Sequence, residues 1–185
     1  MLCASFGYSG IFIFISGSSF VLIDGLGLPP DLYGYCFAAA ICGYMSGAFA
    51  SGRLHRRWPL DRMIAVGLAV GVFSGLLAAG LAFAGIASVV SVVGPFALFL
   101  AGAGLVLPNS IAASLGPFPR LAGSASALLG FLQMLVASGV GFLVGLLQDG
   151  TPRAMAALLL AVALAGALSF LLLVRAGKAA QAEAG

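Results

Sequence analysis

Four polar side chains lie inside long apolar stretches of this sequence, where they could hold a ligand: Tyr8, Tyr44, Asn109 and Gln133. Each can form hydrogen bonds, and polar groups inside a membrane usually face a bundle interior or a wet cavity. Counted from the same end of the predicted bundle, each lies about seven to eleven residues into its helix, at a common level of about 10 to 17 Å. We therefore predict one substrate cavity with these four residues on its floor. The alternative is that they only form hydrogen bonds between helices.

Covalent catalysis has one candidate nucleophile. Ser9 lies in Gly7-Tyr8-Ser9-Gly10, a pattern found around the nucleophile of intramembrane serine proteases. A nucleophilic serine needs a base within hydrogen-bond reach, and the single histidine, His55, lies in a polar loop rather than inside a later helix. The sequence also lacks the glycine-rich motifs that bind nucleotides. We predict that the chain is not an enzyme.

The cysteines give no sign of a metal or cofactor site. Cys3, Cys36 and Cys42 show no CxxC or Cys/His spacing, so we interpret them as small apolar residues. No cofactor, metal or disulfide is predicted.

The five acidic residues all lie at predicted helix ends or in the tail: Asp24, Asp31, Asp61, Asp149 and Glu183. None of them can take up a proton at the middle of a membrane. If protons drive a transport step, the titrating group must come from another polypeptide or from Asp24 at the outer end of the first span. Asp24 also fits the simpler interpretation of a solvated boundary residue.

Composition places these residues on membrane-spanning helices. Of the 185 residues, 62% are hydrophobic and 7% are charged, whereas soluble domains carry about 25% charged residues. Charge-free runs, each longer than the roughly 18 residues that mark a span, cover 2–23, 32–52, 63–119, 121–148 and 154–174. The run 63–119 is too long for one crossing, so it must reverse, and 85–95 favours a turn there. Within it, Ser88, Ser91, Gly94 and Pro95 fit the cap and first turn of a new helix.

We therefore predict an all-α polytopic membrane protein with six transmembrane helices. The helical unit covers 1–176 and a cytoplasmic tail covers 177–185. The predicted spans are about 2–23, 32–52, 63–84, 91–115, 122–147 and 154–174. A proline inside the fourth span, Pro108, removes one backbone hydrogen bond and predicts a helix kink beside Asn109.

The basic residues orient the helices. One side of the predicted membrane holds seven of the eight: Arg53, Arg56, Arg57, Arg62, Arg120, Arg175 and Lys178. The other side holds Arg153. Because Lys and Arg are concentrated in cytoplasmic loops, we predict a multi-pass protein of the cell membrane with both termini in the cytoplasm. Basic residues at span ends rather than on one face give no indication of nucleic-acid binding.

Small residues recur at every fourth position in three of the spans. They are Gly43, Gly47 and Ser51; Gly67, Gly71 and Gly75; and Ala137, Gly141 and Gly145. Helices in lipid associate by close backbone packing, which this spacing permits. The pattern predicts a tight helix bundle.

Two stretches resemble the major facilitator superfamily, specifically the carboxy-terminal half of a Bcr/CflA-type drug efflux transporter. Residues 6–22 (FGYSGIFIFISGSSFVL) are similar to the seventh helix of that group. Gly104-Leu105-Val106-Leu107-Pro108-Asn109, with 122–133 (AGSASALLGFLQ), resembles the tenth and eleventh helices, and this second stretch is the more specific.

The resemblance implies one half of a 12-helix fold, in which each half is a pair of inverted three-helix repeats. It also implies export of small amphipathic, drug-like compounds coupled to proton entry. Gly52, Arg53, Arg56 and Arg57 are similar to the second copy of the superfamily's cytoplasmic loop motif. The superfamily has another, stronger copy of this motif, and Arg56 stands where that copy has Asp. The sequence therefore does not predict a gating salt bridge at this loop.

Half a transporter cannot provide alternating access, because the substrate path lies between two halves that move against each other. Met1 directly precedes the first span, so we expect a fragment of a transporter. A half-sized subunit that pairs with a second six-helix half, and an inactive relic, are the alternatives. Outside transport, the small-residue seams and the missing midplane acid fit a membrane interaction or assembly subunit.

Overall fold

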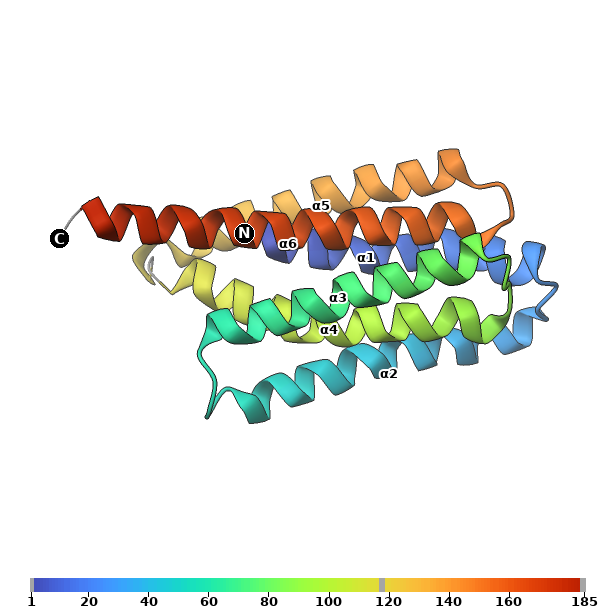
Figure 1. Cartoon of the computed structure of the whole chain (residues 1–185), viewed down its shortest axis with the longest axis horizontal. Coiled ribbons are helices and arrows are strands. Elements are labelled where there is room, and N and C mark those ends of the chain that lie inside the picture. The colour runs from blue at the N-terminus through green and yellow to red at the C-terminus, as the bar shows by residue number, and fades with distance from the viewer. Residues whose placement is uncertain (1, 117–118, 184–185) are drawn as a thin grey trace.

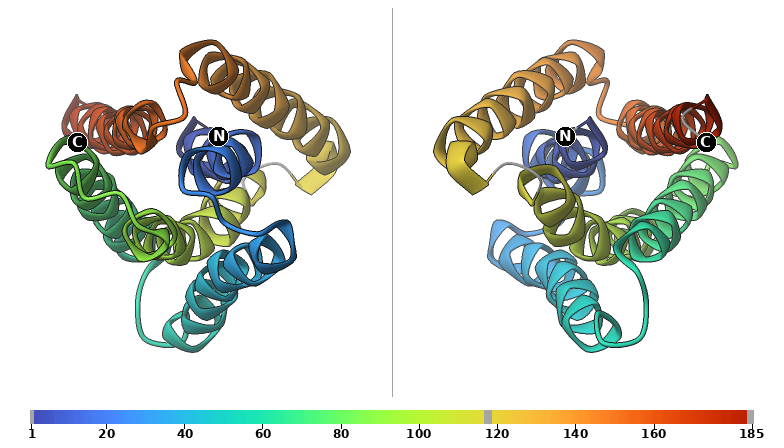
Figure 2. Two further views of the ribbon diagram at one scale, coloured as in Figure 1. Left: turned by 90° about the vertical axis from the view of Figure 1, so that its right-hand side faces the viewer. Right: turned by 90° about the vertical axis from the view of Figure 1, so that its left-hand side faces the viewer.

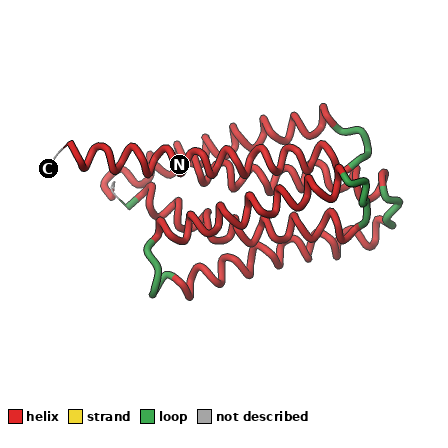
Figure 3. Tube along the Cα trace, in the orientation of Figure 1, coloured by secondary structure: helices red, strands yellow, loops and turns green. Residues whose placement is uncertain are grey.

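The computed structural model describes residues 2–116 and 119–183, with side chains for 2–116 and 120–173. All regular elements in these ranges are helical (Figures 1 and 3). They are α1 (Leu2–Ser19), the π-helix η1 (Phe20–Gly25), α2 (Pro30–Leu54), α3 (Leu60–Phe83), α4 (Val89–Leu115), the 3-10 turn η2 (Pro119–Leu121), α5 (Ala122–Leu147) and α6 (Pro152–Glu183). Six helical segments, with α1 and η1 counted as one, are long and apolar enough to cross a membrane. The predicted all-α, six-span fold is confirmed.

The helix α6 continues beyond residue 174, where we expected the sixth span to end. Its backbone is helical as far as Glu183, and this end extends past the other helices (Figure 1). The predicted tail, 177–185, is therefore helical over its described part, and its last two residues lie outside the described residues.

Prolines and one serine pair set the helix starts. Pro30 and Pro152 begin α2 and α6, where the missing N–H of proline costs no hydrogen bond. At α4 the Ser88 hydroxyl accepts from the Ser91 N–H at 3.1 Å, and the Ser91 hydroxyl accepts from the Ser88 N–H at 2.8 Å. This capping box confirms the predicted reversal but starts α4 at Val89, two residues earlier than expected.

The turn before α6 is built on Asp149. One of its carboxylate oxygens accepts from the Thr151 backbone N–H at 2.9 Å and from the Thr151 hydroxyl at 2.7 Å. These two hydrogen bonds hold the pKa of Asp149 below its ordinary value. The intervening Gly150 has φ +77°, which a glycine adopts without strain.

The six helices pack in a pattern that repeats within the bundle. α1 contacts α5 and α6, α4 contacts α2 and α3, and the two sets meet through α1 with α4 and α3 with α6. If α1, α2 and α3 exchange places with α4, α5 and α6, the same pairs of helices are in contact. The two sets are inverted, because α1 and α4 run in opposite directions. Viewed along the bundle, α1 lies centrally and α2 and α5 lie at the periphery (Figure 2). This is the arrangement of two inverted three-helix repeats.

The small-residue seams make close backbone contacts between helices. A Cβ added to Gly43 or Gly47 of α2 would collide with the carbonyl oxygen of Ala97 or Ala101 of α4. In α3 and α4, a Cβ on Gly67 would lie 2.7 Å from the Gly102 carbonyl oxygen. The close packing predicted from the small residues of α2 and of α3 is confirmed, and each of these helices packs against α4.

On α5 only part of the small-residue seam contacts another helix. Ala137 is fully buried, and a Cβ on Gly141 would approach the Ser16 hydroxyl of α1 at 3.1 Å. Gly145 faces open space.

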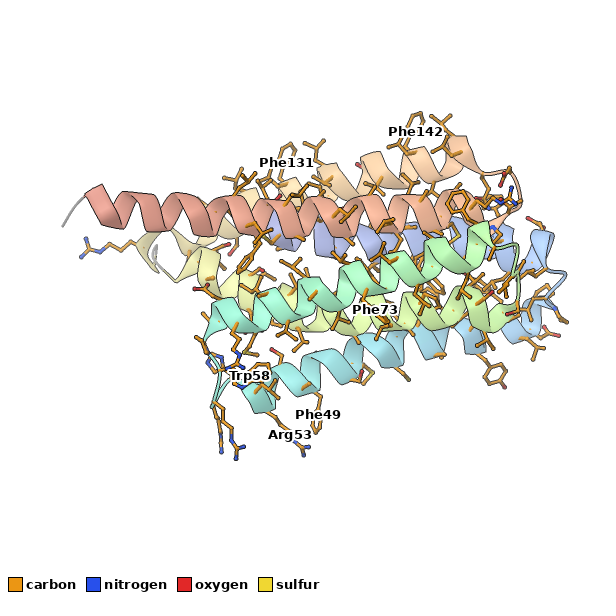
Figure 4. The ribbon with its side chains drawn as sticks, viewed as in Figure 1. Phe49, Arg53, Trp58, Phe73, Phe131 and Phe142 are labelled. Carbon is orange, nitrogen blue, oxygen red and sulfur yellow. The ribbon has the colours of Figure 1, made fainter. Side chains whose placement is uncertain are left out.

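Large apolar side chains cover the outside of the bundle. Phe73 of α3 and Phe131 and Phe142 of α5 are each at least 60% exposed, and Phe131 and Phe142 point away from the other helices (Figure 4). Such a surface suits contact with lipid, and the polar ends of the bundle lie beyond it.

Candidate functional site

Asn109 joins two helices through its amide. Its side-chain nitrogen donates to the Ser51 hydroxyl of α2 at 2.8 Å and to the Leu105 carbonyl of its own helix at 2.6 Å. Asn109 and Ser51 are each 5% exposed. The amide nitrogen therefore points into the contact between α2 and α4, where it fastens the helices together.

Tyr8 lies on a different side of the bundle. Its ring contacts that of Phe12, one turn further along α1, with the ring centroids 5.4 Å apart. Both residues are half-buried, and with Ile15, which is 47% exposed, they form a stripe on the side of α1 that no helix covers completely. This aromatic stripe can accept flat apolar molecules, and the Tyr8 hydroxyl adds one polar group to it.

Tyr44 and Gln133 lie on the two peripheral helices. Tyr44 of α2 is half-buried against the main core, and its backbone approaches Gly104 of α4 closely. Gln133 of α5 is also half-buried and lies on the same helix face as the buried Leu129 and Ala137, which packs toward α1. No hydrogen bond of its amide is recorded within the described part of the chain.

Neighbouring contacts place Tyr8 and Gln133 close to the level of Asn109. Gly7 lies beside Val106 and Leu107, so Tyr8 is level with the stretch of α4 that precedes Asn109. Gly141 lies beside Ser16, and the parallel helices α1 and α5 then bring Gln133, eight residues earlier, level with Tyr8. Tyr44 departs from this level, because Asn109 bonds to Ser51 and Tyr44 lies seven residues before Ser51, about 10 Å along α2. The four side chains also do not share a face, since Asn109 is buried between two helices. A common substrate cavity stays a prediction.

The described cavities within the bundle are small. Two of them have volumes of about 10 Å³, room for roughly one water-sized sphere. The first is lined entirely by apolar residues of α1, α3, α4 and α6, and neither includes any of the four polar candidates. Drug-sized ligands need about 300 to 1,000 Å³, so these cavities are not substrate sites.

Pro108 lies inside α4, which stays helical through it and through Pro95. We expected Pro95 in the first turn of its helix, but the earlier start at Val89 places it within the helix. Its carbonyl accepts a hydrogen bond from the buried Ser74 hydroxyl of α3 at 2.5 Å. Pro108 is exposed on the surface of α4, and its predicted kink remains a prediction.

The loop-motif residues lie at the end of α2 and in the turn before α3. Gly52, Arg53, Arg56 and Arg57 are all exposed. Among the described residues they form no ion pair, and Arg53 instead lies over the Phe49 ring, 4.2 Å from its centroid.

The four acidic residues with described side chains are all exposed. Asp24 lies in the π-helical end of the first span, Asp31 and Asp61 lie in the first turns of α2 and α3, and Asp149 forms the turn described above. Glu183 lies outside the described side chains. None of the described carboxylates lies inside the bundle.

Two residues of this region were missed by the sequence analysis. Ser51 was noted only as a small residue, although it is the partner of Asn109. Phe12 could have been predicted to contact Tyr8, because it lies four residues later and therefore shares the same helix face.

The chain is similar to three bacterial proteins. It is 28% identical to a bicyclomycin resistance protein homolog of Haemophilus influenzae over 84% of this chain and 39% of that protein. It is 30% identical to the uncharacterized MFS-type transporter YdgK of Bacillus subtilis, over 91% of this chain and 42% of YdgK. It is 32% identical to multidrug resistance protein D of Escherichia coli, over 72% of this chain and 33% of that protein.

These matches cover most of this chain but less than half of each relative. No protein-family model and no solved structure matches the sequence. The six apolar helices, their repeated packing and the three transporter and resistance relatives agree with one another. The chain is a multi-pass membrane protein that belongs to the major facilitator superfamily.

Proposed function

We propose that this chain supplies the second six-helix half of a drug exporter, which moves small amphipathic compounds out of the cell as protons enter. The observation that carries the proposal is the similarity to a bicyclomycin resistance homolog and to multidrug resistance protein D over 84% and 72% of this chain. The three relatives are all much longer than the chain, which spans 33% to 42% of their length.

The open side of α1 supports a substrate path at the edge of this unit. Tyr8, Phe12 and Ile15 form an apolar and aromatic stripe with one hydroxyl group, which matches the chemistry of an amphipathic compound. Because the described internal cavities are too small for such a compound, the path would run between this stripe and a facing surface.

The facing surface is proposed to be a second six-helix half, either on a separate chain or on a preceding segment. α2 and α5 have the smallest buried fractions of the six spans, and they lie at the periphery (Figure 2). A partner that packs against them would enclose the stripe on α1 between the two halves.

The proton-binding group is proposed to lie on that second half. The carboxylates described here are exposed near helix ends, where they have free access to water and cannot follow a substrate across the membrane. This arrangement supports coupling through the partner rather than through this chain.

The test is to express the chain with and without a six-helix amino-terminal half in cells that lack their own drug exporters. Efflux of a fluorescent amphipathic cation is measured, with and without a protonophore. We expect efflux only from the paired chains and its loss when the proton gradient collapses. Assembly of the two halves without efflux would contradict the transport proposal.

A matched pair of variants separates the stripe from the lipid surface. Tyr8→Ala with Phe12→Ala removes the two rings of the stripe, and we expect it to reduce efflux at least tenfold. Phe73→Ala, with Phe83→Ala, removes two rings of similar size from the exposed face of α3, a helix not proposed to meet the partner, and we expect near-normal efflux. Equal effects of the two pairs would remove the stripe from the substrate path.

A further inference from the structure

Four arginines surround the turn between α2 and α3. Arg53 lies in the last turn of α2, Arg56 and Arg57 lie in the turn, and Arg62 lies in the first turn of α3. All four are exposed. We refer to them as the α2–α3 arginine cluster.

Two members of the cluster lie over aromatic rings. The Arg53 guanidinium lies 4.2 Å from the Phe49 ring centroid, and the Arg62 guanidinium lies 4.5 Å from that of Trp58. Such cation–π contacts limit the motion of long side chains without neutralising their charge. Figure 4 shows Phe49, Arg53 and Trp58 together at this end of the bundle.

The positive charge of the cluster is not balanced by the protein. Asp61 is the only acidic residue between Arg53 and Arg62, and none of the four arginines forms an ion pair in the part of the chain that the structure describes. The opposite end of the bundle has one basic residue, Arg153. The cluster therefore presents four arginines against one aspartate at one membrane surface, and none of the four is in an ion pair within the described residues.

The rings identify the kind of anion that fits. Phe49 is 62% exposed and lies one helical turn from Arg53, about 6 Å closer to the middle of the membrane. Trp58 is half-buried beside Arg62, a position typical of tryptophan at the headgroup level. The Phe49 ring thus lies beneath the Arg53 guanidinium, as acyl chains lie beneath a phosphate in a lipid, and Trp58 lies at the level of the turn.

We propose that the α2–α3 arginine cluster binds the phosphate headgroups of anionic phospholipids. Arg53 and Arg62 contact the phosphate, while the exposed Phe49 ring contacts the acyl chains below it. Clusters of basic residues beside a transmembrane helix attract anionic lipid, with a contribution that corresponds to about fivefold in affinity for each Lys or Arg. The site does not depend on transport activity.

The test measures lipid bound to the purified chain in detergent by native mass spectrometry, with equal amounts of phosphatidylglycerol and phosphatidylcholine. We expect selective binding of phosphatidylglycerol, which weakens as salt is added because the interaction is electrostatic. The variant Arg53→Gln with Arg62→Gln should lower this binding by about 25-fold. Arg56→Gln with Arg57→Gln, which disturbs no ring contact, serves as a second test and should lower it in the same direction.

The control is Arg153→Gln at the opposite end, which should bind phosphatidylglycerol as the unaltered chain does. Equal binding of the two lipids, or equal losses in Arg153→Gln and the cluster variants, would overturn the proposal. Inorganic phosphate at matched ionic strength distinguishes a lipid site from a site for the free ion. Displacement of phosphatidylglycerol by phosphate would also overturn a lipid site.

Discussion

The amide of Asn109 illustrates how a polar residue in a membrane helix is satisfied by a neighbouring helix. Its nitrogen bonds to the Ser51 hydroxyl across the contact between α2 and α4, and both residues are almost fully buried. This geometry agrees with the role of a helix fastener. A role in substrate binding would require α2 and α4 to separate, since the amide nitrogen has both of its recorded partners within these two helices.

A double-mutant cycle tests the fastening role. We expect Asn109→Ala and Ser51→Ala each to destabilise the bundle, with a coupling of about 0.6 kcal/mol, the average measured for such bonds in membranes. Unfolding by a denaturing detergent in bicelles gives the free energies. As a control, Ser138→Ala removes a hydroxyl that bonds only within α5, and no coupling to Asn109 is expected. Zero coupling between Asn109 and Ser51 would mean that their hydrogen bond contributes nothing to stability.

The helices α2 and α4 are the pair whose backbones approach most directly through glycine. Gly43 and Gly47 lie against the carbonyls of Ala97 and Ala101, and Gly104 of α4 lies against the backbone of α2 at Tyr44 and Ala48. Small residues from both helices therefore share the contact. Close packing of this kind replaces the hydrophobic effect as the force that holds helices together in lipid.

Adding one methyl group to this contact should separate the helices. We expect Gly47→Ala to lower the free energy of unfolding by about 1 to 3 kcal/mol, because the new Cβ collides with the Ala101 carbonyl. The matched control is Gly34→Ala in the same helix, where a Cβ meets nothing within 4 Å. That variant should leave stability unchanged or raise it by up to about 1 kcal/mol, since alanine favours a helix over glycine. Equal changes in stability in the two variants would show that the contact with the Ala101 carbonyl does not decide the result.

The whole molecule has an asymmetric distribution of charge between its two ends. The α2–α3 arginine cluster and Arg120, in the turn between α4 and α5, lie at one end of the helices, and Arg153, at the start of α6, lies at the other. The bundle itself is nearly symmetric, because its two three-helix repeats are inverted with respect to each other. The charges, rather than the packing, therefore decide which end faces the cytoplasm.

Reporter fusions test this orientation. We expect green fluorescent protein inserted after residue 57 to fluoresce and alkaline phosphatase inserted after Gly150 to be active, because the first works in the cytoplasm and the second outside it. The exchanged fusions provide the control and should both be inactive. Activity of the exchanged pair instead would show that both termini face the outside.

The sequence alone determined the number of spans and their approximate limits, since apolar length and helix-breaking residues are local properties. The reversal near Ser88 and the glycine seams of α2 and α3 could be recognised without a structure. The starts of α2 and α6 at Pro30 and Pro152 were placed two residues late, at 32 and 154. The start of α4 was misplaced by two residues, because Pro95 was taken for a first-turn proline when the pair Ser88 and Ser91 sets the cap.

Only the tertiary structure decided which way each polar residue points. Counting along the helices placed Tyr8 and Asn109 at one depth, and the helix contacts agree with that level. Counting did not show that Asn109 is buried against Ser51 while Tyr8 and Phe12 form a half-buried aromatic stripe on α1. Depth follows from the fixed rise of a helix, whereas the direction of a side chain around the helix axis has meaning only once its neighbours are in place.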